Sequence, residues 1–486
     1  MDSAYPQSNP PRFRGSIPDG TGRGTTRSAM APTAPQRTIV VVGGNAAGLA
    51  AASRAKRSDP TARVVVFEAG PTPSVSNCNF SYVLSGKLDG PSRVVAHPPG
   101  YFTARGLELE LESPVVEVRA TERRLRVEPR GGAAYEAAYD RLVYCAGALA
   151  RRLEVPGRDE GGVHALHSYT DFTALHADLG GRDPERMIVV GGGFKALSVG
   201  AALSRRFAVS LVCVEPRPLP DLAPELLAVL EEHLAGLGVD VHAGRNPAGY
   251  LHDRSGRLVG LEADGATIPG GFALELIGVL PNTAPLGGAL ELDRRSGAVV
   301  VDTRQATSLD GVYAAGDCAV AHHALLPGRH HLPNGALANR AGRVAGANAA
   351  GGSRRSAPAL GTRATELYGL ELSRTGLGLE EARAAGYDAR RVYVKALNHA
   401  TFHLPRVYLH ASAVFEEGSG RLLGVQLAGP SGANHRINAA AAAVAVGMSV
   451  GEAAGLDFAY HPHSSPVWDP LLVLFRAAQR RLEEGE

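Results

Sequence analysis

The sequence lacks the features that mark membrane, secreted and nucleic-acid-binding proteins. No apolar run is long enough to span a bilayer, and the longest, the Ala/Val stretch 439–446, is too short. The N-terminus has no apolar core of a secretion signal. Lys+Arg number 50 against 48 Asp+Glu, so no polybasic surface indicates nucleic acid or an anionic membrane. We therefore expect a small-molecule partner, without nucleic acid or membrane.

Cysteine is also scarce, because the 486 residues include only Cys78, Cys145, Cys213 and Cys318. Their wide, unequal spacing fits neither a metal site nor a disulfide framework, and it is typical of a reducing compartment. We expect a cytoplasmic protein with no bound metal. Cys145, Cys213 and Cys318 lie in apolar strand ends or turns and predict structural roles, whereas Cys78 lies in the stretch SVSNCNFSYVLSG.

One pattern occurs twice: a β-branched run, a glycine-rich turn, a helical stretch and a second β-branched run that leads to an acid. The first copy reads TIVVVGGNAAGLAAASRAKR and then RVVVFEAG. The second copy reads RMIVVGGGFKALSVGAALSRR and then VSLVCVEP. This duplication predicts an α/β protein with two Rossmann-like dinucleotide-binding domains.

Composition and pattern divide the chain into four parts. Residues 1–36 are rich in Pro, Gly, Ser and Arg and predict a disordered tail. We expect the first dinucleotide-binding domain to be split between 37–158 and 281–352, with the second at 159–280. Residues 353–486 combine alternating strands with an Ala-rich helix, which predicts an α+β dimerisation domain.

The first glycine-rich turn carries a candidate nucleotide site. Gly43 permits a tight bend, and Gly48 lets the following helix pack closely on the strand. Asn45 and Ala46 lie where the helix N-terminus offers free amides to a pyrophosphate. Glu68 follows Gly48 by twenty residues, where a carboxylate accepts hydrogen bonds from a ribose. The alternative is an ordinary strand-helix connection.

The ordered set GGNAAG, FEAG, YDRLVYCAGA, GGGFKAL and VYAAGDC resembles the two-dinucleotide-domain flavoprotein disulfide reductases over about residues 38–480. The segment around Cys78 and the tail YHPHSSPVWDPLL resemble one branch of them, the coenzyme A-disulfide reductases with their NADH oxidase and persulfide reductase relatives. The peroxidase branch differs, because it carries a histidine in the first turn. The resemblance implies a homodimer that binds FAD in the first domain and NADPH or NADH in the second.

The resemblance also assigns cofactor contacts to two further segments. Ala146 and Gly147, in YDRLVYCAGA, are candidate FAD contacts. Asp317, in AAGDC, closes a turn of small residues that would let its carboxylate approach a ribityl chain. Alternatively, Asp317 only caps the following helix.

The resemblance makes Cys78 the redox-active residue beside the flavin. Ser74 and Asn77 match the Ser-x-x-Asn-Cys segment of that branch and are candidate substrate contacts. We expect Asn77 to cap a helix that Cys78 opens, because helix amides would favour the thiolate, which is the reactive form. The alternative is a buried, inert cysteine.

Four residues on the helix after the first turn lie where the resemblance implies contact with the nucleotide end of coenzyme A: Ser53, Arg54, Lys56 and Arg57. Their cations would pair with phosphates. Alternatively, they are a solvated basic helix end.

The resemblance implies that Tyr460, in the C-terminal tail, reaches across the dimer to the cysteine of the other subunit. His461 and His463 replace residues that are usually apolar, so we expect a proton donor near the sulfur, or else two exposed loop histidines. A second tyrosine of the family is replaced here by the stretch with Phe402 and His403, which predicts altered substrate handling.

The second glycine-rich turn keeps Gly191, Gly192 and Gly193, and Phe194 stands where an aromatic residue gates the access of nicotinamide to the flavin. Ala196 replaces the third glycine, as is often seen with NADPH. We expect these residues to hold the nicotinamide nucleotide.

Other positions of the second fold depart from the family. Lys195 and Ser198 replace an apolar residue and a glutamate, and Cys213 replaces the acid that holds the adenosine ribose. Glu215 is a candidate substitute for that acid, and Lys195 or Arg217 would favour the extra phosphate of NADPH.

We therefore expect an FAD-dependent NAD(P)H:disulfide oxidoreductase that reduces coenzyme A disulfide or a related small disulfide or persulfide through Cys78. Two alternatives remain open. One is a flavin-thiol enzyme that acts on a sulfur-containing metabolite, by oxidation or carbon-sulfur bond chemistry, with little use of nicotinamide. The other is a non-catalytic redox sensor that binds flavin or coenzyme A.

Overall fold

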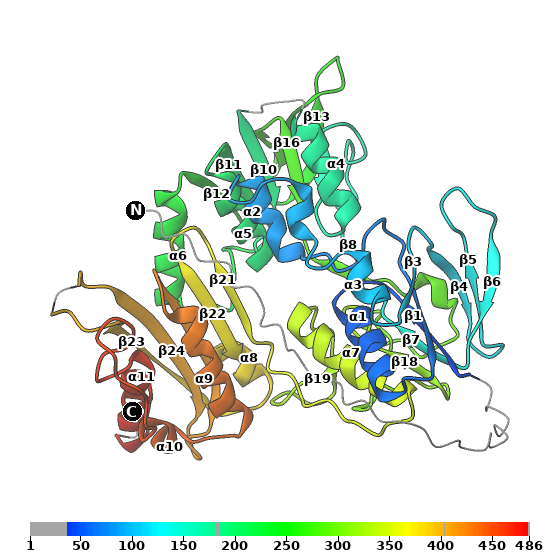
Figure 1. Ribbon diagram of the computed structural model, residues 1–486. Helices are drawn as coiled ribbons and strands as arrows, with labels where there is room; N and C mark the ends of the chain where they lie inside the picture. Colours follow the sequence, from blue (N-terminus) through cyan, green and yellow to red (C-terminus); the bar gives the residue numbers. More distant parts are fainter. Residues whose placement is uncertain (1–35, 181–184, 403, 485–486) are drawn as a thin grey trace, which may run out of the picture. The chain divides into compact units, whose positions relative to one another are not determined.

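Figure 1 shows the computed structural model of the chain, which describes residues 36–180, 185–402 and 404–484. The predicted tail, residues 1–36, lies outside the described residues apart from Gln36, and so does His403. All described helices and strands belong to one unit, which begins at Arg37.

The first glycine-rich turn follows the central strand of a five-stranded parallel sheet, with strand order β18-β7-β1-β2-β3. These strands are β1 (Thr38–Val42), β2 (Arg63–Phe67), β3 (Glu108–Glu110), β7 (Arg141–Tyr144) and β18 (Val312–Ala314). The central strands are buried, as the unbroken β-branched sequence predicts for a parallel sheet with both faces covered.

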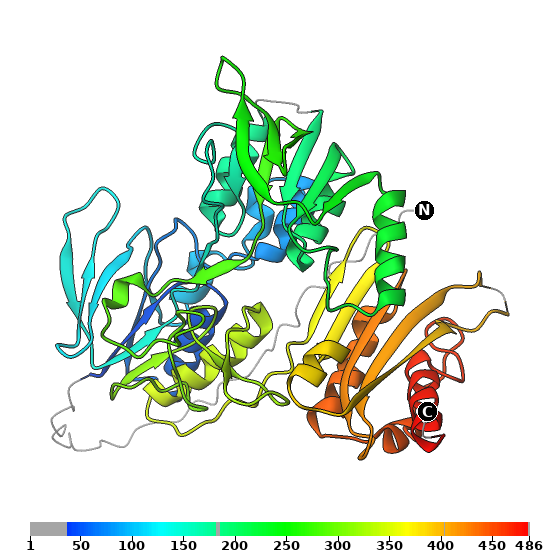
Figure 2. The same cartoon turned by 180° about the vertical axis from the view of Figure 1, so that it is seen from behind.

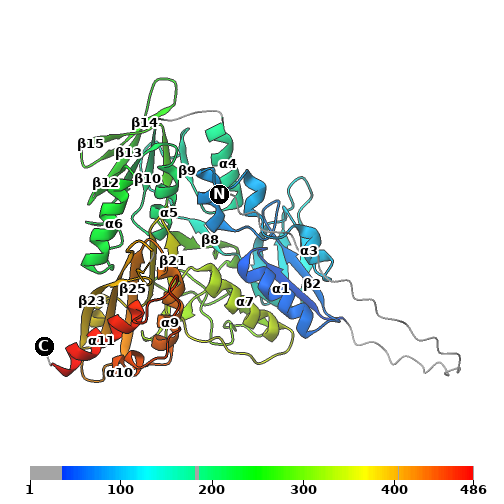
Figure 3. The same cartoon turned by 60° about the vertical axis from the view of Figure 1, so that its left-hand side comes forward.

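Helix α1 (Ala46–Ser58) packs on α7 (Gly335–Ala349), and the two lie side by side in Figures 1 and 3. Gly342 and Gly346 make this contact possible. A Cβ atom at these positions would lie 2.1 Å and 2.0 Å from the carbonyl oxygens of Ala47 and Ala51. Only glycine allows such an approach, which explains the Ala/Gly composition of α7.

The second glycine-rich turn follows β10, the middle strand of another parallel sheet with the order β12-β11-β10-β16-β9. Its strands are β9 (Val163–Ala165), β10 (Arg186–Val190), β11 (Ala208–Cys213), β12 (Val239–Ala243) and β16 (Phe272–Glu275). Its helices are α4 (Tyr169–Gly180), α5 (Phe194–Leu203) and α6 (Pro224–Gly236). The two parallel sheets confirm the predicted pair of dinucleotide folds.

Each parallel sheet carries a three-stranded antiparallel insertion. The insertions are β4 (Val115–Arg119), β5 (Arg124–Val127) and β6 (Tyr135–Ala138), and β13 (Pro247–His252), β14 (Leu258–Ala263) and β15 (Ala266–Pro269). The chain leaves the first fold through β8 (Ala148–Ala150) and returns through β17 (Val279–Pro281), and these two strands pair antiparallel. The two segments that connect the folds therefore lie next to each other.

The C-terminal part is a five-stranded antiparallel sheet of order β21-β22-β25-β24-β23. The strands are β21 (Arg363–Glu366), β22 (Glu371–Gly376), β23 (Ala389–Leu397), β24 (Tyr408–Glu416) and β25 (Leu422–Gly429). The helices are α8 (Leu379–Ala384), α9 (Ala433–Ala445), α10 (Val450–Ala454) and α11 (Pro470–Glu483). Figure 2 shows this sheet from behind, in yellow and orange, with the red helix α11 against it.

None of the described helices is both long and apolar enough to cross a membrane.

Candidate functional site

The backbone of the first turn requires glycine. Gly43 has φ +104°, and a Cβ atom there would lie 2.2 Å from the carbonyl oxygen of Cys145. A Cβ atom at Gly48 would lie 1.8 Å from the carbonyl oxygen of Gly43. The turn therefore brings the N-terminus of α1, with the exposed residues Asn45 and Ala46, to the carboxyl edge of the sheet. This geometry fits the pyrophosphate of a dinucleotide.

Glu68 follows β2 and is positioned by the same turn. Its Oε2 accepts a 2.6 Å hydrogen bond from the Gly44 amide, and its Oε1 accepts one of 2.7 Å from the Gly70 amide. Burial raises the pKa of the Glu68 carboxyl, against the opposing effect of these amides. A partly buried carboxylate at the turn fits the ribose contact expected in an FAD site.

Asp317 lies at the start of the loop between β18 and α7. Its Oδ1 accepts a 3.2 Å hydrogen bond from the Asn334 amide, and burial raises the pKa of its carboxyl. The alternative that Asp317 caps the following helix is wrong, because Asn334 caps α7 through its own side chain. Asp317 instead lines a hollow in the first fold, together with Gly316, Ala319 and Ala338.

Ala146 and Gly147 follow β7, and Gly147 has φ +67°. The backbone amide of Asn282 donates a 3.0 Å hydrogen bond to the Gly147 carbonyl, and the Asn282 side chain donates one of 3.4 Å to the Ala146 carbonyl. These bonds connect the two chain segments that link the folds, those that contain β8 and β17, beside the candidate FAD site.

Cys78 is exposed, whereas the other three cysteines are buried. It is the middle residue of a single 3-10 turn, Asn77–Asn79, and α2 (Phe80–Leu84) follows. The prediction that Asn77 caps a helix opened by Cys78 is wrong. The Asn77 side chain instead donates a 2.6 Å hydrogen bond to the His167 carbonyl, in the second fold.

The cysteine segment is tied to both dinucleotide folds. Ser74, with φ +61°, donates its amide to the Gly44 carbonyl at 2.9 Å, and Asn45 accepts a 2.8 Å hydrogen bond from the Val75 amide. On its other side the buried Phe80 stacks on Phe172 of α4, with ring centroids 4.5 Å apart. Cys78 therefore sits between the FAD-type turn and the core of the second fold.

The second turn resembles the first in its backbone. Gly191 has φ +131°, and a Cβ atom there would lie 2.5 Å from the Leu276 carbonyl oxygen. Gly193 precedes α5, whose first residue, Phe194, packs against the apolar core. A hollow beside the turn is lined by Gly192, Gly193, Phe194, Glu215, Leu219, Pro220, Asp221, Leu222 and Arg374.

Two carboxylates line this hollow, those of Glu215 and Asp221, and Glu215 is the one beside the glycine turn. Cys213 is buried, and its thiol donates to the Glu215 carbonyl at 3.6 Å. A Cβ atom added at Gly192 would lie 3.5 Å from Oε2 of Glu215. Glu215 therefore lies against the glycine turn much as Glu68 does in the first fold.

Lys195 is turned away from this hollow, so the prediction that it meets an extra phosphate there is wrong. Its Nζ donates to the Leu166 carbonyl instead. Burial lowers the pKa of Lys195 to about 8, while the negative charges of Asp171, Cys78 and Asp317 act in the opposite direction. The sequence did not predict this relationship between Lys195 and Cys78, because no motif or spacing around either residue indicates it.

Basic residues of α1 belong to a larger arginine cluster. The nearby Arg354 lowers the pKa of Arg54 most, and Arg57 and Arg343 add smaller effects of the same sign. Lys56 differs, because its Nζ donates to the Ala62 carbonyl at 2.8 Å. Ser53 is partly buried on the same helix.

The C-terminal tail is exposed. Tyr460, Val467 and Trp468 are 48%, 65% and 55% exposed, and Phe402 is 82% exposed. Such large apolar side chains on one domain are typical of a surface that another chain covers.

The tail histidines are also exposed. The rings of His461 and His463 lie 5.8 Å apart, and the amide of His461 donates to the Ser465 carbonyl at 3.3 Å. Arg436 fixes the tail through a 2.7 Å ion pair with Asp469. The tail is thus ordered although its side chains face outward.

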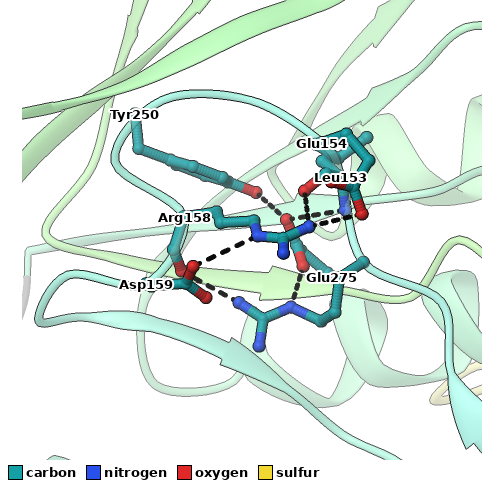
Figure 4. Close-up of polar contacts among 7 residues, drawn as sticks. Leu153, Glu154, Arg158, Asp159, Tyr250 and Glu275 are labelled. Atoms are coloured by element: carbon teal, nitrogen blue, oxygen red, sulfur yellow. Dashed lines mark hydrogen bonds and ion pairs between the residues drawn. The ribbon is translucent and has the colours of Figure 1, made fainter.

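Figure 4 shows a buried carboxylate that sequence reasoning missed, that of Glu275 at the end of β16. It is paired with Arg152, beside the first crossing between the folds. Its only sequence signal is an acid within the apolar run FALELIG.

The sequence matches the family described as pyridine nucleotide-disulphide oxidoreductase over residues 37–350 and its dimerisation domain over residues 365–470. A curated relative, the NAD(P)H coenzyme A polysulfide/persulfide reductase of Pyrococcus horikoshii, is 31% identical over 447 residues, 91% of this chain and 98% of the relative. An NADH oxidase of Methanocaldococcus jannaschii is 26% identical over 452 residues, 91% of this chain and 99% of the relative.

Among solved structures, an NAD-dependent persulfide reductase from A. fulgidus superposes with a TM-score of 0.88 at 27% identity, over 92% of this chain and 84% of that one. The chain therefore belongs to the pyridine nucleotide-disulphide oxidoreductases, an enzyme family that uses FAD and NAD(P)H.

Proposed function

We propose that this enzyme reduces coenzyme A disulfide, or a related small disulfide or persulfide, through Cys78. The observation that carries the proposal is the position of one exposed thiol between two dinucleotide folds, with the other three cysteines buried. A buried thiol cannot meet a disulfide in solution, so Cys78 is the candidate nucleophile.

The chemistry of Cys78 is thiol-disulfide exchange. Its thiolate attacks one sulfur of the substrate disulfide, a bond forms between Cys78 and that sulfur, and the other sulfur leaves as a thiolate that takes a proton. Bound FAD would pass two electrons from NAD(P)H to the mixed disulfide, which releases the second thiol and restores the Cys78 thiolate.

The chain's own residues would hold the reacting sulfur in place. Ser74 and Asn77 fix the Cys78 segment between the two folds. In a homodimer, Tyr460, His461 and His463 of the tail would supply protons to the departing thiolate. Their exposure in one chain supports this role, because a group that acts on a second copy must face outward.

The arginine cluster supports coenzyme A as the thiol. Arg354, Arg57 and Arg343 act on Arg54 as like charges, so an anionic ligand would relieve the repulsion at Arg54. The nucleotide end of coenzyme A carries several phosphates. The relatives named as coenzyme A polysulfide/persulfide reductases agree with this choice.

Replacement of Cys78 tests the proposal. Cys78→Ser should retain bound flavin and its reduction by NADH or NADPH, yet lose NAD(P)H consumption with coenzyme A disulfide. Cys145→Ala, which changes a buried cysteine, should keep most of the activity. Full turnover by Cys78→Ser would overturn the assignment of the sulfur. A flavin that neither NADH nor NADPH bleaches in stopped-flow mixing would overturn the reductase itself.

A further inference from the structure

We propose that Lys195 is a positioning residue for Cys78, whose ammonium holds the reactive sulfur in its thiolate form. The inference rests on the proposed function in one respect, namely that Cys78 is the reacting sulfur. It adds a charged partner from the other dinucleotide fold, at a position where the family resemblance predicts an apolar side chain.

The first support is the place of the ammonium in the fold. Lys195 is the second residue of α5, which packs against the helix that follows Cys78, and Figure 1 shows α2 beside α5. Its Nζ donates to the Leu166 carbonyl. The next carbonyl along the chain, that of His167, accepts the Asn77 side chain at 2.6 Å.

These two hydrogen bonds tie Lys195 and the residue before Cys78 to consecutive carbonyls of the chain. Consecutive residues lie only about 3.8 Å apart along a chain, so the Leu166 and His167 carbonyls are close neighbours. Lys195 binds one of them, and the residue next to Cys78 binds the other. The short segment between β9 and α4 therefore links the two side chains.

The charges around Lys195 leave its ammonium available to the sulfur. The charges that act on Lys195 come from Asp171 in α4, Asp317 in the first fold and Cys78 in the turn before α2, and the Lys195 charge in turn acts on His167. Asp171 is already engaged, because its Oδ2 accepts hydrogen bonds from the amides of His167 at 2.9 Å and Ser168 at 2.8 Å. Within the described residues Lys195 forms no ion pair.

A partly buried ammonium without a paired carboxylate stabilises a nearby anion strongly, because little water screens the interaction. Burial lowers the pKa of Lys195 to about 8 and so disfavours its charge. The amine remains mostly protonated at neutral pH, where it would favour the Cys78 thiolate. Above about pH 8 it loses its proton, and its effect on the sulfur fades.

The test compares Lys195→Met, which removes the charge at similar length, with Lys195→Arg, which keeps it. The reduced holoenzyme is alkylated with iodoacetamide between pH 5 and 10, and the modification of Cys78 is followed by mass spectrometry. Lys195→Met should raise the midpoint of thiolate formation by about one pH unit or more, which makes alkylation about tenfold slower below both midpoints. Lys195→Arg should stay close to the wild-type midpoint.

Lys395→Met is the matched control, because Lys395 is exposed and its ammonium lies 4.9 Å from the centroid of the Tyr408 ring, in the C-terminal sheet. It should leave the Cys78 midpoint unchanged. If Lys195→Met folds poorly, Lys195→Gln serves in its place. An unchanged midpoint in the uncharged variant, or an equal shift in Lys195→Arg, would show a merely structural lysine and overturn the proposal.

This experiment separates the two proposals. Alkylation reports on the Cys78 sulfur directly and needs no turnover, so it remains informative even if Cys78→Ser keeps its activity. Retained activity in Cys78→Ser would overturn Cys78 as the reacting sulfur, whereas the alkylation midpoint would still decide whether Lys195 controls the charge of this thiol. The long-wavelength absorbance of a thiolate next to oxidised flavin gives an independent readout, which should titrate at the same shifted midpoint in Lys195→Met.

Discussion

The hydroxyl of Tyr250 donates a 2.9 Å hydrogen bond to the carboxylate of Glu275, which is 1% exposed (Figure 4). Arg152 forms an ion pair with the same carboxylate, and the Leu153 amide donates to it at 3.4 Å. Burial, with a further contribution from Glu275, raises the pKa of Tyr250, so its hydroxyl keeps the donated proton. The Glu275 carboxylate thus connects the end of β16 to Arg152 and Leu153, in the segment that leads from the first fold into the second.

Tyr250→Phe should lower the free energy of unfolding by about 1–2 kcal/mol, because the buried carboxylate loses one donor while the ring remains. Arg152→Met should cost more, about 3–5 kcal/mol, because it leaves a buried charge without its partner. Urea unfolding of both variants measures the two values. A loss in Arg152→Met no larger than that in Tyr250→Phe would contradict the ion pair as the main support of Glu275.

The parts of the site that depend on local backbone rules could be predicted from the sequence. Gly43 and Gly191 stand at turns with positive φ, and Glu68 lies at the end of the next strand, so spacing alone locates them. The repeat of strand, turn and helix likewise predicts both parallel sheets.

The parts of the site that depend on partners far away in the sequence could not be predicted from it. Asn77 was expected to cap a helix, but its partner carbonyl lies 90 residues away. Lys195 binds a carbonyl 29 residues earlier, and Arg152 is paired with an acid 123 residues later. No periodicity or motif records such pairings, because they arise only when the two folds pack together.

Glu215 should make the enzyme prefer NADH. Its carboxylate lies beside the Gly192 turn, where it can accept hydrogen bonds from an adenosine ribose and would repel an additional phosphate. Glu215→Gln should narrow the ratio of kcat/KM for NADH over NADPH by about tenfold, the effect of roughly 1.4 kcal/mol. Glu231→Gln, on α6 and outside the lining of the hollow, should leave the ratio unchanged. A preference of the wild-type enzyme for NADPH would contradict this prediction.

The arginine cluster should recognise phosphate and not the disulfide itself. Arg57→Gln and Arg354→Gln should each raise KM for coenzyme A disulfide several-fold and weaken its dependence on salt, because each removes one cation from the site. Steady-state kinetics with a small disulfide that lacks phosphates, such as cystine, is the matched comparison. An equal rise in KM for both substrates would place the arginines outside the coenzyme A site.

His167 should account for part of the loss of stability in acid. Burial lowers its pKa from 6.5 to about 4, and the Lys195 charge lowers it further, against the opposing effect of Asp171. Since the folded pKa is depressed, the unfolded chain takes up a proton at this histidine first as the pH falls. Its contribution to stability is complete above pH 6.5 and decreases between pH 6.5 and 4, by as much as about 3 kcal/mol.

The variant His167→Gln removes this titration. Its unfolding free energy should therefore fall less than that of the wild type between pH 7 and pH 4, in urea titrations at fixed ionic strength. His435→Gln, at an exposed position on α9, should follow the wild-type profile. Parallel profiles for wild type and His167→Gln would contradict the prediction. They would mean that the pKa of His167 is not depressed in the folded protein, and that the segment between β9 and α4 is more open to water than its contacts indicate.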